Sequence, residues 1–312
     1  MIGLIDVLGP HHVPSGLSTN IISDISQLLT YHFMVNAFAA GTIVAIGASV
    51  IGWFMVLRRQ TFAGHTLAVI GFPGAAGAAL LGASITLGYF ATCVAGAIVI
   101  GLIPRSPSGR PRGSESALIG TLQAFALACG VLFVSLYRGF LDQLTSLLFG
   151  GFLGITNTQV VTLALVCLVA VCALAIIGRP LFFASIDPDV ALARGVPVRT
   201  LSLIFMILVG LAVAEASQIT GSLLVFALLV MPGAAAQRLT NSARYSLMIS
   251  LASAIAMTWC ALGAAYYSIY PVGFYLTTFG FALYLLALAI EWMNNTRSSR
   301  SRARLRGSGM RA

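Results

Sequence analysis

Apolar residues occur in long runs, separated by short polar connections. Runs of about twenty apolar residues, the length of a helix that crosses roughly 30 Å of hydrocarbon, recur along the chain. Only helices and closed barrels satisfy their backbone hydrogen bonds in that environment. The pattern predicts an all-α, polytopic helical membrane protein of about eight or nine transmembrane helices, at approximately 33–57, 61–83, 85–104, 115–137, 158–178, 200–217, 220–238, 245–268 and 272–292.

The composition supports this fold class. The chain has 312 residues, of which 59% are apolar and 8% charged, and its mean hydropathy is +0.98. In soluble domains about a quarter of the residues are charged, so a soluble globular protein is excluded. Three regions are expected: an extracytoplasmic segment over 1–30 with a short amphipathic helix, a transmembrane domain over 31–293 and a disordered tail over 294–312. The apolar piece 141–153 is too short to span and is expected to be interfacial or re-entrant.

Arginine is distributed very unevenly between the two sides of the predicted spans. With the C-terminal end of the first span in the cytoplasm, sixteen of the seventeen arginines lie on that side and only Arg138 lies outside. Basic residues are retained on the cytoplasmic side of membranes. We therefore expect a multi-pass protein with its N-terminus outside and its C-terminus in the cytoplasm.

The net charge of +9 does not indicate a nucleic-acid partner, because the arginines are not interleaved with stacking aromatic residues. Six of them lie in the tail at 297–311. Such a basic segment attracts anionic membrane lipids, by about 1 kcal/mol for each residue close to the surface. Membrane lipids, and no nucleic acid, are therefore the expected partners of the tail.

One polar stretch, at about 185–196, carries the start and stop signals of a short helix on the cytoplasmic side. Its N-terminus has a capping residue, a proline and an acidic residue, and its C-terminus has a basic residue and a glycine. A helix of about two turns is marginal alone and needs a partner to dock against. The residues that carry these signals are Asp187, Pro188, Asp189, Arg194 and Gly195.

A Pro-Gly-Ala-Ala sequence occurs twice, in the second and seventh spans, which run in opposite directions. We expect helix breaks at Pro73 and Gly74 and at Pro232 and Gly233. Broken helices at matching positions of inverted halves line the path of many transporters. In a chain this rich in alanine and glycine, coincidence is an equal alternative.

The sequence does not predict an enzyme. It has no lysine and therefore no GxxxxGK[ST] phosphate loop, so any ATP must be bound by another subunit. The spans contain no nucleophile with an evident base. The five cysteines lie in apolar spans without metal-ligand spacing, and we interpret them as small buried side chains.

Two side chains within the spans are candidate ligands of a transported metal ion. His65 lies early in the second span and Glu215 late in the sixth. A carboxylate at membrane depth normally faces a bundle interior or a water-filled path, and imidazole and carboxylate groups suit first-row divalent metals. The alternatives are a Glu215 hydrated at the outer turn and a His65 that binds lipid headgroups or backbone carbonyls. No permanently bound cofactor is expected.

Several stretches, in the same order and at similar spacing, resemble the permease subunits of bacterial ABC importers for zinc and manganese. The resemblance covers about 33–291 and includes 56–59, 64–67, 72–74, 114–120, 147–150, 187–196 and 221–232. It implies a bacterial plasma-membrane permease that works with a second permease copy, a cytoplasmic ABC ATPase dimer and an extracytoplasmic metal-binding protein. The cargo would be Mn²⁺ or Zn²⁺, with Fe²⁺ as a further candidate, and the helix at 185–196 would couple the permease to the ATPase.

The sequence departs from this family in its second span. The family usually has an aspartate there and a histidine four residues later, whereas this chain has His65 and Val69 at those positions. Two other readings stay open. One is a permease for an iron chelate or a vitamin, in which the changed motif reflects a larger ligand. The other is a secondary carrier that works without an ATPase.

Overall fold

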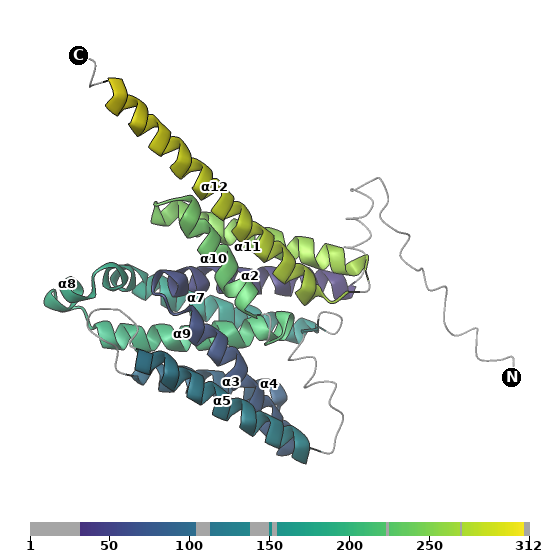
Figure 1. Ribbon diagram of the computed structural model, residues 1–312. Helices are drawn as coiled ribbons and strands as arrows, with labels where there is room; N and C mark the ends of the chain where they lie inside the picture. The colour runs from purple at the N-terminus through teal and green to yellow at the C-terminus, as the bar shows by residue number, and fades with distance from the viewer. Residues whose placement is uncertain are drawn as a thin grey trace, which may run out of the picture.

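A computed structural model describes residues 32–103, 113–137, 150–151, 155–222, 225–268 and 270–308. Figure 1 shows that the described chain is built from helices, which confirms the all-α prediction. The helices are α2 (His32–Leu57), α3 (Thr61–Leu80), α4 (Ile85–Leu102), α5 (Gly113–Leu136), α7 (Asn157–Ile186), α8 (Pro188–Ala193), α9 (Val198–Thr220), α10 (Val225–Leu239), α11 (Ala243–Tyr266) and α12 (Val272–Ser308).

Eight of the described helices are long and apolar enough to cross a membrane, in agreement with the expected eight or nine. Of the nine predicted spans, the seventh (220–238) is not matched by a helix of membrane-spanning length among the described residues. α9 continues to Thr220 and ends before Gly221, which has a positive φ of 76°. Among the described residues, the next helix, α10 (Val225–Leu239), has 15 residues, fewer than a full membrane crossing needs.

The helices form three groups. α2, α7 and α9 lie in the middle; α3, α4 and α5 pack together on one side, and α10, α11 and α12 on the other (Figure 1). α4 packs on α9, whereas α10 and α11 pack on α2. α2 and α9 thereby connect the two outer groups, and buried side chains such as Phe205 of α9 and Ile51 of α2 form the core.

The expected helix breaks are not present. α3 continues through Pro73 and Gly74, and α10 through Pro232 and Gly233, each as one helix. Membrane helices tolerate proline because neighbouring groups compensate for the lost hydrogen bond. The adjacent glycines serve close packing instead: a Cβ at Gly74 would lie 2.0 Å from Thr92 Oγ1, and one at Gly233 would lie 3.1 Å from the Cα of Trp53.

The arginine-rich tail also differs from expectation. α12 continues to Ser308, so the region expected to be disordered from 294 onward is helical to that point. Figure 1 shows this end of α12 extending away from the other helices. The segment has no proline before Ser308 and arginine is a good helix former, so the helix propagates. The predicted amphipathic helix at 1–30 and most of the 141–153 piece lie outside the described residues.

Candidate functional site

The predicted polar helix is present as α8, between α7 and α9 at one end of the bundle (Figure 1). The side chain of Asp187 accepts a hydrogen bond of 3.1 Å from the backbone N–H of Val190, and Pro188 is the first helical residue. Gly195, with φ of 78°, ends the helix. The expected caps are therefore confirmed, whereas the helix itself is shorter than 185–196 because Ser185 and Ile186 belong to α7.

The C-terminus of α8 is a Schellman motif, in which two backbone bonds close the helix around a left-handed residue. The N–H of Gly195 donates to Leu192 O (2.9 Å), and the N–H of Val196 donates to Ala191 O (3.0 Å). The guanidinium of Arg194 lies 5.6 Å from the ring centroid of Phe183 in α7. These contacts fix α8 in one position on the end of α7.

α8 presents apolar side chains to the outside. Val190 is 41% exposed, Leu192 53% and the adjoining Ile186 63%, whereas Ala191 is fully buried. The acidic Asp187 and Asp189 are also exposed. A mixed apolar and acidic surface of this kind, held on a capped helix at the end of the bundle, is suited to contact another protein.

Arg58 connects α8's two flanking helices to the end of α2. Its Nη1 donates to Ser185 Oγ in α7 (3.1 Å) and its Nη2 donates to Ser202 Oγ in α9 (2.7 Å). Its guanidinium carbon lies 5.5 Å from the ring centroid of Phe205. One side chain therefore contacts the chain both before and after α8.

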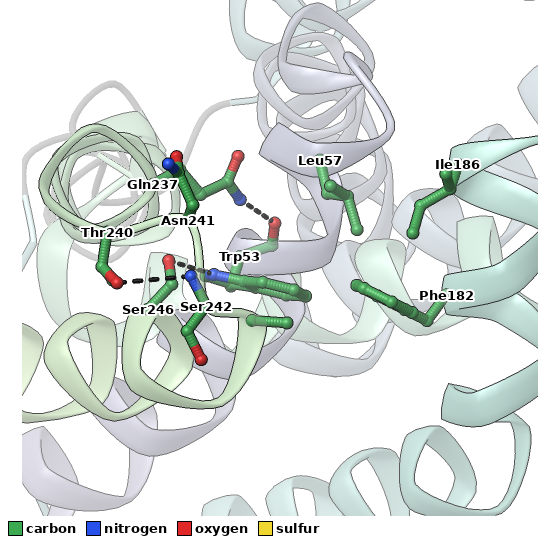
Figure 2. Close-up of a pocket in the computed structure, with 10 residues that line it drawn as sticks. Trp53, Leu57, Phe182, Ile186, Gln237, Thr240, Asn241, Ser242 and Ser246 are labelled. Carbon is green, nitrogen blue, oxygen red and sulfur yellow. Dashed lines mark hydrogen bonds between the residues drawn. The ribbon is translucent and has the colours of Figure 1, made fainter.

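A cavity of about 270 Å³ lies beside this region, between α2, α7 and the α10–α11 turn (Figure 2). The indole Nε1 of Trp53 donates to Ser246 Oγ (2.8 Å), and Gln237 Nε2 donates to the backbone oxygen of Trp53 (2.8 Å). The Trp53 ring stacks against Phe182 at an interplanar angle of 15°. The cavity has one wall of apolar and aromatic side chains and one of polar side chains; its lining is Trp53, Leu57, Phe182, Ile186, Gln237, Thr240, Asn241, Ser242, Ala243 and Ser246.

His65 lies in the second turn of α3, close to the α2–α3 connection. Its side chain is half-buried, and its ring meets that of Phe226 in α10 edge to face, with 6.2 Å between centroids. Phe226 is itself 37% exposed. The neighbouring Thr66 is buried and donates to Gln123 of α5 (3.0 Å). The imidazole therefore lies where α3 meets α10, with part of its surface accessible.

Glu215 is enclosed within the protomer. It is 1% exposed, and its Oε1 has no hydrogen-bond partner within the described part of the chain. A Cβ added to Gly47 of α2 would lie 3.5 Å from Glu215 Oε2 and 3.1 Å from the sulfur of Cys167 in α7. The carboxylate therefore points toward α2 and α7. Its environment excludes the alternative of a hydrated outer-turn glutamate in this conformation.

The two candidate ligands have different neighbours: His65 contacts α10, whereas Glu215 lies against α2 and α7. Among the described residues, no group of three or more His, Cys, Asp or Glu side chains could hold a metal ion. The cysteines are free, and of these Cys172 and Cys260 are exposed on the helical bundle rather than buried as expected.

The sequence assigned no contact or role to Trp53 or Gln237, and Arg58 was noted only as part of the stretch 56–59. Their partners lie far away along the chain: Arg58 contacts residues 127 and 144 positions later, and Trp53 a residue 193 positions later. The only available signal was a polar side chain at the end of an apolar run. That signal predicts a helix end, but it does not identify the partner.

Comparison with known proteins extends these observations. A model of the ABC 3 transport family matches residues 30–291. The manganese transport system membrane protein MntC of Halalkalibacterium halodurans is 32% identical over 254 residues, which are 81% of this chain and 85% of that protein. The chelated iron transport system membrane protein YfeC of Yersinia pestis is 30% identical over 247 residues, 79% and 81% of the two chains. Among solved structures, PsaBC from Streptococcus pneumoniae in complex with Fab matches with a TM-score of 0.75 and 25% identity, over 86% of this chain and 95% of that one.

Proposed function

The chain belongs to the ABC 3 transport family and is the membrane permease of a metal importer, and we propose that its cargo is a bare divalent ion, Mn²⁺ first and Zn²⁺ second. The observation that carries this proposal is the match to manganese transport membrane proteins over most of the chain. The half-buried imidazole of His65 supplies a ligand type that such ions accept. As a permease the chain is a transport component, and ATP is hydrolysed by a separate subunit.

Within this proposal, α8 is the site at which a cytoplasmic ABC ATPase binds. It is a capped helix with exposed Val190 and Leu192, and a helix of six residues is stable only when docked. The importer would contain two ATPase subunits, a second permease copy and an extracytoplasmic metal-binding protein that delivers the ion. The arginine-rich end of the molecule would face the cytoplasm, with the N-terminus outside.

The transport path is proposed to pass His65 at the meeting of α3 and α10. A transported ion must be released, so weak and incomplete coordination is an advantage there. A second permease copy would present the same residue again by symmetry. Glu215 is proposed as a transient ligand that becomes available only when α2 separates from α7, because it is enclosed in the conformation described here.

Uptake measurements test this assignment. Cells express the complete importer with the wild-type permease, the His65→Ala variant or the Glu215→Gln variant. Each strain is given radiolabelled Mn²⁺, Zn²⁺ or chelated iron, and uptake is measured. We expect both variants to lose most Mn²⁺ uptake. Glu291→Gln is the matched control, because that carboxylate is 37% exposed and pairs with Arg238 away from the proposed path. Wild-type uptake by both path variants would refute the ligand assignment.

A chelate permease is the second candidate, because a relative named for chelated iron transport is 30% identical. The same assay separates the two cargoes. Wild-type uptake of chelated iron in preference to both bare ions would overturn the first proposal. Transport by the purified permease without an ATPase would overturn both.

A further inference from the structure

We propose that Arg58 is a positioning residue that couples α8 to the α2–α3 turn, so that movement of α8 by the ATPase reaches the start of α3 and His65. This inference rests on the proposed function, because it concerns how that function is driven. It is carried by contacts that connect three helices at one guanidinium: two hydrogen bonds and one cation–aromatic contact.

The first observation is that Arg58 contacts both flanks of α8. Ser185 lies two residues before the N-cap of α8, and Ser202 lies in the second turn of the helix that follows it. The two serine hydroxyls accept from different nitrogens of the same guanidinium. A displacement of α8 that moves both flanks together must therefore displace Arg58 or break both bonds.

The second observation is that Arg58 is tightly connected to α3. The α2–α3 connection is a Schellman motif: the N–H of Arg59 donates to Val56 O (3.0 Å) and that of Gln60 donates to Met55 O (2.9 Å). Arg59 adopts φ of 55° without being a glycine, and α3 begins at Thr61. Only three residues separate the helices, so the end of α2 and the start of α3 move together.

Side-chain packing strengthens this connection. A Cβ added to Gly64 would lie 2.6 Å from the sulfur of Met55, so the first turn of α3 is in direct contact with the last turns of α2. His65 is the next residue. A shift of the Arg58 backbone therefore reaches the proposed path ligand through one short turn and one packed contact.

The chemistry of the contact requires arginine. The planar guanidinium presents several donors in a fixed arrangement, so it can bind two separate acceptors while its face lies on the Phe205 ring. A lysine ammonium is a single point of charge and cannot hold both hydroxyls in the same geometry. Phe205 is fully buried, so it provides a fixed surface for the guanidinium.

The test uses the complete importer, with permease, ATPase and metal-binding protein together, in proteoliposomes supplied with ⁵⁴Mn²⁺ on the side of the metal-binding protein. Arg58→Met is compared with Arg58→Lys, with the double variant Ser185→Ala, Ser202→Ala, and with Arg199→Met, an exposed arginine of α9. ATP hydrolysis, ⁵⁴Mn²⁺ uptake and the amount of ATPase that copurifies are measured for each. We expect Arg58→Met and the double serine variant to lose at least about tenfold in ions moved per ATP while they retain the ATPase. Arg58→Lys should lie between them and the wild type, and Arg199→Met should equal the wild type.

Two results would overturn the proposal. One is an unchanged ratio of uptake to hydrolysis in Arg58→Met. The other is a parallel fall of uptake, hydrolysis and copurifying ATPase, which is what a purely structural role predicts. Adding Arg58→Met to the double serine variant should have little further effect on the ratio, because the interacting groups act as one unit; a full additional loss would also contradict the mechanism.

A readout that does not depend on the cargo separates this inference from the proposed function. The variant Phe62→Cys places a thiol in the first turn of α3, at a side chain that is 47% exposed. The maleimide reactivity of this thiol is measured with and without a non-hydrolysable ATP analogue, and the reactivity of the chain without the substitution is subtracted. Nucleotide should change the reactivity in the otherwise wild-type importer and not in the Arg58→Met importer. No nucleotide effect in either would refute the coupling route, whatever ion the importer carries.

Discussion

α2 and α10 pack backbone against backbone at Gly52, and replacing this residue with alanine should separate the two helices. A Cβ at Gly52 would lie 1.8 Å from the carbonyl oxygen of Leu229 and 2.7 Å from its carbonyl carbon. The opposing contact is also made by a glycine, since a Cβ at Gly233 would lie 3.1 Å from the Cα of Trp53. Both sides of the crossing are backbone, so no side-chain rotation can relieve the overlap.

The loss in free energy of unfolding can be estimated from this geometry. Non-bonded heavy atoms are best separated by about 3.5 Å, so the backbones must move apart by roughly the difference of 1.7 Å. Overpacked cores cost about 1–3 kcal/mol when side chains can adjust, and backbone overlap puts Gly52→Ala at the upper end, about 3 kcal/mol. A separation would also strain the Gln237 bond to the Trp53 backbone oxygen, worth about 1 kcal/mol.

Thermal unfolding of the purified permease in detergent measures the effect. A loss of 1 kcal/mol in unfolding free energy lowers the midpoint of thermal unfolding by about 2–4 °C, so Gly52→Ala should lower that midpoint by roughly 6–12 °C. Gly263→Ala is the matched control, because it lies in α11 with no atom within 4 Å of the added Cβ. Alanine is the better helix former, so the control should be unchanged or more stable. A Gly52→Ala midpoint equal to that of the control would refute this account of the α2–α10 crossing.

Three other predictions concern local features. Asp187→Ala together with Gly195→Val removes a cap worth about 1 kcal/mol and forces a branched residue into a left-handed conformation, so uptake per ATP should fall, whereas Asp187→Asn, which keeps the cap, should equal the wild type. Arg59→Gly should raise the melting midpoint, because a non-glycine residue at positive φ costs about 1–2 kcal/mol; an unchanged midpoint would contradict that. Glu291→Gln removes an ion pair of 2.8 Å to Arg238, and because both side chains are more than a third exposed, the change in stability should stay below about 1 kcal/mol.

Local signals in the sequence predicted the helices and the caps of α8. The length of an apolar run fixes whether it can cross a membrane, and the roles of Asp187 and Gly195 depend only on residues up to four positions away. The same signals failed at Pro73 and Pro232, because whether a proline interrupts a helix depends on its neighbours in the bundle. They failed again in the tail, where the end of α12 extends an existing helix rather than starting a new one.

The candidate site was predictable only as separate residues. The length of the apolar runs predicts that His65 and Glu215 lie within spans, but it does not show which helix each one faces. The structure places one against α10 and the other between α2 and α7. Arg58 was visible as a basic residue after an apolar run, whereas its bonds to Ser185 and Ser202 depend on how three helices pack.

Two kinds of contact hold the helices of this fold together. At the end that carries α8, directional hydrogen bonds such as those of Arg58 and Trp53 connect helices that are distant in sequence. Deeper in the bundle, the helices approach closely at small residues such as Gly52 and Gly47, and single bonds such as that from Cys167 Sγ to Ile43 O (3.3 Å) also connect them. If an ATPase binds α8 as proposed, its pull would reach α2 and α9 through the two bonds of Arg58. Glu215 lies beside Gly47, so the proposed exposure of its carboxylate requires α2 and α7 to separate and the bond between Cys167 and Ile43 to break.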